Sequence, residues 1–263
     1  MITVYCSQQM TIKAIIFDVD GTLAETEKQG HRVAFNLAFK QANLPWQWDI
    51  DLYGQLLEIG GGKERLRHYL AQYQPQFKLH GNEDLDTFIK RIHKLKSDYF
   101  RQLLEQSSIP LRVGVERLIT EAYEQGITLA IASTASEENV QALLDNSLDG
   151  QMGKYFSVIA AGDMVKNKKP APDIYLLALE KLNLSPTECI AIEDTNQGLR
   201  GATTAELKTI VTVNDYTQDQ NFDLATLVIN NLGEADQPFQ VIQGDSYGHH
   251  YVNMSLLQTL LEK

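Results

Sequence analysis

Two aspartates, two residues apart, are the first feature of this sequence that could do chemistry. Asp18 and Asp20 follow a nearly continuous apolar run, and Gly21 comes directly after them. If the chain turns at the glycine, both carboxylates can point the same way. One carboxylate can attack a phosphoryl group and form an aspartyl-phosphate, while another group carries the proton. Taken alone, Asp-x-Asp-Gly is more often a simple turn.

Three later segments place further polar side chains next to apolar runs. They contain Ser133, Lys169 and the pair Glu193-Asp194. Each has an ordinary interpretation: a helix-cap hydroxyl, a solvated loop charge, or acids that begin a helix. All of them, however, are tied to strand ends, and ligands of open parallel sheets bind at the carboxyl ends of the strands. Their convergence is the strongest functional signal in the sequence.

The residue types in this convergence fit phosphoryl transfer, which depends on positioning and charge neutralisation. Mg²⁺ prefers carboxylate, carbonyl and phosphate oxygens. Asp18, the carbonyl of Asp20, and Asp194 could therefore hold the ion. Ser133 and Lys169 could contact the phosphoryl group that is transferred.

Alternating strand and helix patterns predict the framework that positions these residues. Strands are expected at 12–19, 128–132, 158–161, 189–192, 209–213 and 227–229. Between the later strands lie helical patterns at 114–125, 137–145, 173–182 and 197–205. This rhythm predicts an α/β fold with a doubly wound parallel sheet.

The long interval between the first and second strands predicts an inserted helical domain. It carries helical patterns at 31–41, 51–57, 63–72 and 84–105 and no comparable strand. We therefore expect a catalytic core from residues 10–25 and 110–232 and a helical cap from 26–109. Residues 233–263 are expected to form a tail that packs on the core, with a closing helix at 253–262.

Composition excludes several classes of protein. The chain has 263 residues and a net charge of -11, which disfavours nucleic-acid binding because that depends on cationic surfaces. No apolar run approaches the ~20 residues of a membrane span. Cys6 and Cys189 do not make a disulfide framework. Without a visible secretory signal, we expect a cytoplasmic monomer, or a stromal protein in a photosynthetic eukaryote; residues 1–9 resemble an extension before Met10.

The motifs together resemble the haloacid dehalogenase superfamily. Phe17-Asp18-Val19-Asp20-Gly21-Thr22-Leu23 is similar to its first signature. Ser133, Lys169 and Glu193-Asp194 stand where the other three signatures fall. Residues 169–175 are similar to the Lys-Pro-x-Pro-Asp form of the beta-phosphoglucomutase-like subfamily, and the helical insert resembles its cap.

This resemblance implies a Rossmann-like core, Mg²⁺ as cofactor, and a role for each motif residue. Asp18 would be the nucleophile, and Asp20 would protonate the leaving group and then activate water. Ser133 and Lys169 would bind the phosphoryl group. The metal would rest on Asp18, the Asp20 carbonyl and Asp194, with Glu193 behind them.

A glycine run in the predicted cap suggests a second anion site. Gly60, Gly61 and Gly62 lead into a helix that carries Lys63 and Arg65. Glycines and helix N-termini favour bound anions, although a flexible turn before a helix with surface charges is an ordinary alternative.

The cap residues as a group resemble those of the CbbY-type phosphatases, which remove a phosphate from xylulose-1,5-bisphosphate. The similarity covers residues 25–27 and 30–36, Tyr53, and residues 61–65. It implies a sugar bisphosphate as substrate, with Glu25 on a hydroxyl and Lys63 and Arg65 on the distal phosphate. The remaining residues implied at the substrate are Tyr53, Gly61, Gly62, Ser133, Thr134 and Lys169.

Other interpretations stay open at this point. A sugar-phosphate mutase of the beta-phosphoglucomutase kind uses the same core, and a phosphatase of broad sugar-phosphate specificity would carry the same motifs. A non-catalytic phosphate sensor or partner-binding protein is a further alternative, although it would not need Asp20. His31 and Arg32 could be core and surface residues of the first cap helix, and His249-His250 is interpreted as structural.

Overall fold

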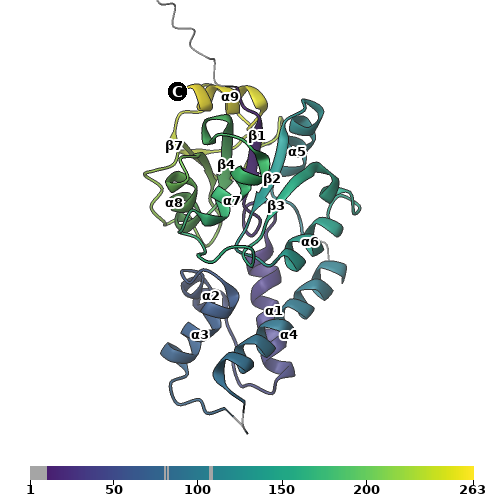
Figure 1. Ribbon diagram of the computed structural model, residues 1–263, viewed down its shortest axis with the longest axis vertical. Helices are drawn as coiled ribbons and strands as arrows, with labels where there is room; N and C mark the ends of the chain where they lie inside the picture. The colour runs from purple at the N-terminus through teal and green to yellow at the C-terminus, as the bar shows by residue number, and fades with distance from the viewer. Residues whose placement is uncertain (1–10, 80, 82, 107–108) are drawn as a thin grey trace, which may run out of the picture.

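A seven-stranded sheet forms the centre of the upper part of the molecule in Figure 1. This computed structural model describes residues 11–79, 81, 83–106 and 109–263, so the expectation about residues 1–9 and Met10 lies outside the described residues. The strand order is β3-β2-β1-β4-β5-β6-β7. The strands are β1 (Ala14–Phe17), β2 (Thr128–Ala132), β3 (Phe156–Ala160), β4 (Cys189–Glu193), β5 (Lys208–Thr212), β6 (Leu227–Ile229) and β7 (Val241–Gly244).

The predicted α/β class with a parallel sheet is confirmed for six of these strands. Every neighbouring pair from β3 through β6 runs parallel. Strand β7 was not predicted, and it pairs antiparallel with β6 at the edge of the sheet. Its residues are mostly exposed, so it lacks the continuous apolar run that marks the buried strands.

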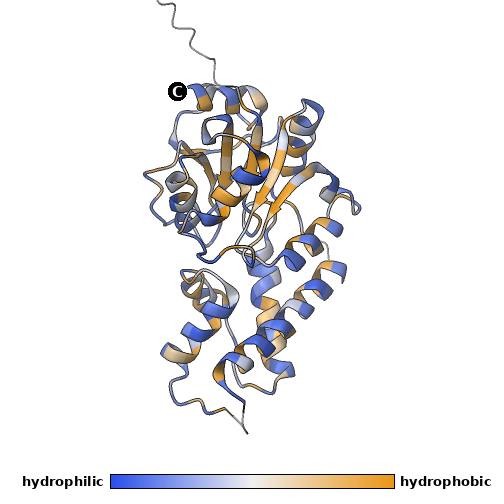
Figure 2. Cartoon of the chain, in the orientation of Figure 1, coloured by the Kyte–Doolittle hydropathy of each residue, from blue (hydrophilic) through white to orange (hydrophobic). Residues whose placement is uncertain are grey.

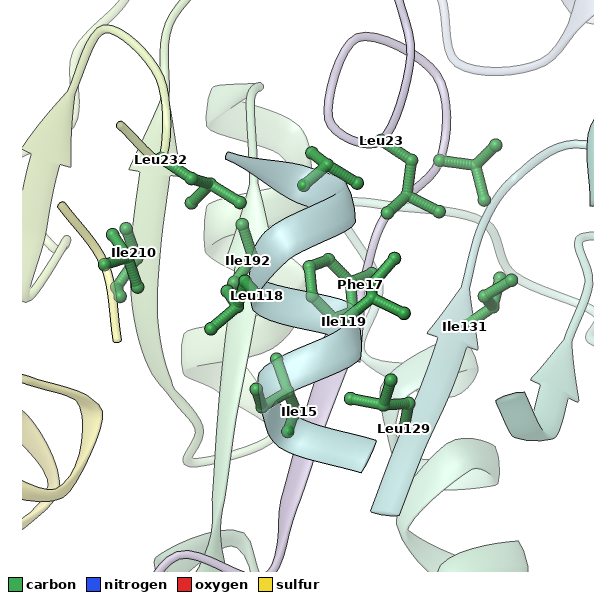
Figure 3. Close-up of a cluster of buried hydrophobic side chains, with 14 of the residues drawn as sticks. Ile15, Phe17, Leu23, Leu118, Ile119, Leu129, Ile131, Ile192, Ile210 and Leu232 are labelled. Carbon is green, nitrogen blue, oxygen red and sulfur yellow. The ribbon is translucent and has the colours of Figure 1, made fainter. Parts of the chain in front are cut away.

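Helices cover both faces of the sheet because β1 is apolar on both sides. Ile15 and Phe17 join a cluster with Leu118 and Ile119 on one face, whereas Ala14 and Ile16 face a second cluster. Figure 3 shows the first of these clusters beneath α5. The helices of this part are α5 (Val115–Glu124), α6 (Glu137–Asp145), α7 (Asp173–Leu182), α8 (Asn196–Thr204) and α9 (Met254–Glu262), with short 3-10 turns at Met152–Tyr155 and Pro186–Glu188.

A group of helices lies between β1 and α5 in the sequence and hangs below the sheet in Figure 1. It contains the π-helical turn η1 (Glu27–His31), α1 (Arg32–Gln41), α2 (Ile50–Leu56), α3 (Gly62–Tyr73) and α4 (Leu85–Gln106). An aromatic cluster holds these helices together, with Phe39 and Trp48 fully buried at its centre. We refer to this helical group, from η1 to α4, as the cap.

Hydropathy follows burial along the chain. Figure 2 shows apolar residues concentrated in the strands and hydrophilic residues on the outward faces of the helices. Among the described residues, no helix has both the length and the apolar character required to cross a bilayer. The closing helix α9 packs on the core through its leucines.

Arg112 ties several loops at the carboxyl edge of the sheet, a role that no sequence pattern predicted. Its side chain is buried and donates to the carbonyl oxygens of Thr212, Val213 and Asn230. It also donates to the carbonyl of Gly21, in the loop that carries the two aspartates. One buried guanidinium therefore satisfies four carbonyl groups from three parts of the chain.

Arg112→Leu should lower the free energy of unfolding by about 3–5 kcal/mol, because it leaves buried carbonyl acceptors without a donor. Urea unfolding monitored by tryptophan fluorescence measures the change. Arg67→Leu is the control, since Arg67 forms an exposed pair with Asp86 and should cost less than ~1 kcal/mol. Equal losses in the two variants would contradict the role assigned to Arg112.

Candidate active site

Three buried carboxylates meet where β1 and β4 end side by side. Phe17 pairs with Ile192 across the two strands, and the Asp18 amide donates to the Ile192 carbonyl at 2.9 Å. This register places Asp18 beside Glu193 and Asp194. One carboxylate oxygen from each of the three lies within 4.8 Å of the others. The sheet register alone therefore produces the cluster that the sequence predicted at this edge.

Lys169 supplies a positive charge at the centre of this cluster. Its Nζ lies 2.5 Å from Asp18 Oδ1 and 2.5 Å from Glu193 Oε1, and it also donates to the carbonyl of Ala132 at 2.9 Å. The Tyr175 hydroxyl donates to the same oxygen of Glu193. Glu193 is fully buried, so its main task in this geometry is to fix the lysine against Asp18.

One lysine does not balance three buried carboxylates. Burial raises the pKa of Asp18 to about 8, even though the adjacent Lys169 lowers it. Burial also raises the pKa of Asp194 well above its usual range, and the charges of Asp18 and Glu193 raise it further. An oxygen-rich set with excess negative charge suits a hard divalent cation, which would favour the ionised forms.

Backbone geometry lets Asp194 approach the first loop. Gly21 has φ +84°, and a Cβ at this position would lie 2.3 Å from Asp194 Oδ2. Asn214 Nδ2 donates to the same oxygen at 2.7 Å. A residue with a side chain at position 21 would therefore be strained and would also push the carboxylate out of the cluster.

Asp20 is held by a chain of donors that comes from the cap. The Thr26 hydroxyl and His31 Nε2 lie 2.5 Å and 2.8 Å from its Oδ1. Lys96 Nζ lies 2.8 Å from His31 Nδ1. Because an ammonium only donates, His31 Nδ1 must accept, and Nε2 carries the proton that is donated to Asp20. Both donors to Asp20 share Oδ1, which leaves Oδ2 for proton transfer.

These contacts favour the ionised form of Asp20. Burial would raise its pKa, but the His31 and Thr26 contacts and the charge of Lys96 outweigh it and hold the pKa well below its usual range. Burial lowers the pKa of Lys96 to about 8, opposed by the charges of Asp20 and Glu27. In this arrangement Asp20 is an ionised base, the form that activation of a water molecule requires.

Two adjoining cavities lie between the cap and the sheet edge. The first measures about 470 Å³ and the second about 290 Å³. Both are bounded by the same five residues, which form a common wall: Asp20, Glu27, Gly61, Arg65 and Thr134. Asp18, Lys169 and Asp194 belong to the first cavity alone, whereas Lys63 and Lys168 belong to the second alone.

The two cavities differ in charge. The first has two cations, Arg65 and Lys169, against six acids, which are Asp18, Asp20, Glu27, Glu58, Asp194 and Asp219. The second has four cations, Lys63, Arg65, Lys96 and Lys168, against Asp20, Glu27, Glu64 and Asp163. His93 also lines the second cavity, and burial together with the neighbouring lysines lowers its pKa to about 3. The first cavity therefore suits a metal ion, and the second is the more favourable place for an anion.

Comparison with known proteins gives the family. The family model described as haloacid dehalogenase-like hydrolase matches residues 12–205. The chain belongs to the haloacid dehalogenase-like hydrolases. It is 40% identical over 248 residues to protein CbbY of Cupriavidus necator, a match that covers 94% of this chain and 96% of that protein.

Two further relatives narrow the chemistry. A phosphorylated carbohydrates phosphatase of Thermotoga maritima is 32% identical, with 76% of this chain and 84% of that protein covered. A crystal structure of a point mutant of CbbY from Rhodobacter sphaeroides, in complex with xylulose-1,5-bisphosphate, superposes with a TM-score of 0.76 at 41% identity. That match covers 86% of this chain and 98% of the other chain. This hydrolase is therefore a phosphatase, an enzyme that cleaves phosphoric monoesters.

The remaining residues that were predicted to bind substrate differ in how close they lie to the two cavities of the hydrolase. Thr134 lines both cavities, while the Ser133 hydroxyl accepts from the Ala135 amide at 3.1 Å. Tyr53 is fully buried in the cap and reaches the cavity wall through its contact with Glu27. Glu25 lines neither cavity, and it pairs instead with Arg112 at 2.9 Å.

The glycine run of the hydrolase begins α3 as predicted, and its geometry explains the glycine at position 61. Gly61 has φ +94°, and a Cβ there would lie 2.9 Å from Lys168 Nζ. The cap and the core thus approach closely at this residue. Arg65 is buried and donates to the carbonyls of Leu56 and Ile59 and to the Tyr53 hydroxyl.

The sequence did not identify the two residues of the hydrolase that orient Asp20, which are His31 and Lys96. His31 was weighed as a core residue, and Lys96 was an undistinguished position on a long helix. Only the contact of His31 with Asp20, and that of Lys96 with His31, identifies them. His249 and His250 follow the turn at residues 247–248 and belong to no cluster of potential metal ligands among the described residues.

Lys96→Met should lower kcat by roughly tenfold or more, because His31 loses the donor that fixes its tautomer and Asp20 loses its orientation. Steady-state phosphate release at saturating substrate measures the effect. Lys94→Met is the matched control, since Lys94 lies on the same helix and pairs with Asp98 at the surface. An unchanged kcat in Lys96→Met would show that the chain from Lys96 to Asp20 does not assist proton transfer.

Proposed function

We propose that this phosphatase removes one phosphate from a sugar bisphosphate, with xylulose-1,5-bisphosphate as the best candidate substrate. The observation that carries the proposal is the pair of cavities with a common wall and unlike charge. A bisphosphate has two anionic ends, and only one of them is cleaved. The acidic first cavity, with a metal ion bound, suits the phosphate that is cleaved. The second cavity suits the phosphate that the product retains. The CbbY structure with bound xylulose-1,5-bisphosphate supports this choice of substrate.

The residues of the first cavity fit a two-step reaction. The Asp18 carboxylate attacks phosphorus and the bond from phosphorus to the ester oxygen breaks. Asp20 enters this step in the protonated form that the preceding turnover leaves, gives its proton to the departing alcohol, and becomes the carboxylate that its contacts favour. Water then attacks the aspartyl-phosphate, Asp20 takes the water proton, and free phosphate leaves with Asp18 regenerated. Lys169 holds Asp18 throughout and faces the transferring phosphoryl group.

A divalent cation completes this scheme. We propose Mg²⁺, held by Asp18, the carbonyl of Asp20, and Asp194, with Glu193 behind them. When bound, the ion would neutralise charge on the phosphoryl oxygens. Glu193 already accepts from Lys169, Tyr175 and the Asp194 amide, so its oxygens are occupied by protein donors.

Asp18→Asn should reduce turnover to the rate of the reaction without enzyme, because an amide cannot act as the nucleophile. Release of phosphate from xylulose-1,5-bisphosphate with and without Mg²⁺ measures this, and circular dichroism checks the fold. Turnover near the wild-type rate would exclude an aspartyl-phosphate.

A panel that includes ribulose-1,5-bisphosphate, beta-glucose-1-phosphate and phosphoglycolate tests the choice of substrate. Isomerisation of beta-glucose-1-phosphate without phosphate release would indicate a mutase.

Lys63→Ala tests the second cavity. Lys63 is exposed and lines only this cavity, so its removal should not disturb the cap. A charge-assisted contact contributes about 1.5–3 kcal/mol, so kcat/KM for the bisphosphate should fall about tenfold or more relative to para-nitrophenyl phosphate. Lys40→Ala, in an exposed position on α1, is the control. Equal losses on both substrates would place Lys63 outside the distal phosphate site.

Arg65 gives a less specific test than Lys63. Its guanidinium already donates to two cap carbonyls and to Tyr53, so Arg65→Ala removes a structural contact as well as a charge. Both substrates should therefore suffer in that variant.

A further inference from the structure

Two glutamates follow the catalytic loop, and the structure separates them. The Glu25 side chain is 45% exposed, pairs with Arg112 and lines neither cavity. Glu27 lies on the common wall, beside Asp20 and Arg65. The acid in a position to meet a substrate is therefore the second of the pair.

Neighbouring side chains fix the Glu27 carboxylate in place. Its Oε2 accepts from the Tyr53 hydroxyl at 2.5 Å, and Arg65 Nη1 donates to that hydroxyl at 3.0 Å. Because Tyr53 and Arg65 are buried, this chain orients Glu27 from inside the cap. Among the described residues, no protein donor reaches the other oxygen, Oε1, which remains able to accept a hydrogen bond.

A metal ion does not explain the position of Glu27. Its carboxylate, Asp20 and His31 have potential ligand atoms within 4.8 Å of one another. However, His31 Nε2 carries the proton that it donates to Asp20, because its Nδ1 accepts from Lys96. A protonated ring nitrogen cannot bind a metal ion. The carboxylate is thus available to a ligand that donates hydrogen bonds.

We propose that Glu27 accepts a hydrogen bond from a hydroxyl group on the carbon chain of the substrate, and so selects hydroxylated phosphate esters. A substrate that spans both cavities must pass the common wall, where Glu27 is the acid not used in proton transfer. A carboxylate attracts a hydroxyl and repels a phosphate, so it favours an ester whose middle is hydroxylated and whose charge is at the ends. This inference rests on the proposed function.

The test compares Glu27→Gln with Glu25→Gln. Glutamine keeps an acceptor for Tyr53, so the cap retains its internal contact. The substrates are xylulose-1,5-bisphosphate, which has hydroxyls, and para-nitrophenyl phosphate, which has none. In Glu27→Gln, the ratio of kcat/KM for the first to that for the second should fall about tenfold, mainly through KM, because the oxygen that accepts from the substrate hydroxyl is replaced by an amide nitrogen, which only donates. Glu25→Gln should leave the ratio within about twofold.

A hydroxyl-free bisphosphate separates hydroxyl recognition from charge. Pentane-1,5-diol bisphosphate carries both phosphates, and its inhibition constant should be no weaker in Glu27→Gln than in the wild type. An equal loss on all compounds, an unchanged ratio, or a selective loss in Glu25→Gln would each overturn the assignment. If the wild type does not hydrolyse xylulose-1,5-bisphosphate, the proposed substrate fails. The same ratio is then measured with whichever hydroxylated ester of the panel is hydrolysed, so that Glu27 is judged separately.

Discussion

The contact of Lys169 with Asp18 and Glu193 is the interaction on which the rest of the site depends. Burying three carboxylates at one sheet edge is costly, and a single ammonium 2.5 Å from two of them offsets part of that cost. The residual negative charge is what makes the site suitable for a divalent cation. Three other features of the edge support this cluster. Strands β1 and β4 are neighbours, Gly21 leaves room for Asp194, and the Tyr175 hydroxyl donates a hydrogen bond to Glu193.

Much of the core could be predicted because its cause is local. A continuous apolar run followed by polar residues defines a buried strand and its end, and β2 and β6 have the predicted bounds. Helices α6 and α7 also match, because their apolar spacing is regular. Once the strands are parallel, their carboxyl ends share an edge, and the strand order, with β1 beside β4, then brings Asp18 and Asp194 together. Strand β7 escaped prediction because an exposed edge strand needs no apolar run.

The contacts between cap and core could not be predicted, because they join residues that are far apart in the sequence and no local pattern determines how an inserted domain packs. The choice between Glu25 and Glu27 illustrates this. A regular helical pattern does not reveal the π-helical turn at 27–31, in which the Arg32 amide bonds to the Glu27 carbonyl. That turn carries both Glu27 and His31 toward Asp20. Such turns are rare and occur often at functional sites, and this one places Glu27, two residues after the Glu25 that the family resemblance suggested, on the wall of both cavities.

The division of charge gives a reason for having a cap at all. The chain carries a net charge of -11, and its first cavity is rich in carboxylates, so the sheet edge alone would repel a second phosphate. Binding of a second phosphate therefore requires cations from outside this sheet edge, and helix α3 of the cap contributes Lys63 and Arg65. The ion pairs between the cap and the core include Lys28 with Asp215 at 3.0 Å and Lys168 with Glu64 at 3.4 Å. Exposed pairs of this kind contribute only ~0–1 kcal/mol each. These pairs therefore add little to the apolar contacts of Phe100 and Leu104 with the core cluster, and a bisphosphate that spans both cavities would itself strengthen the attraction between cap and core.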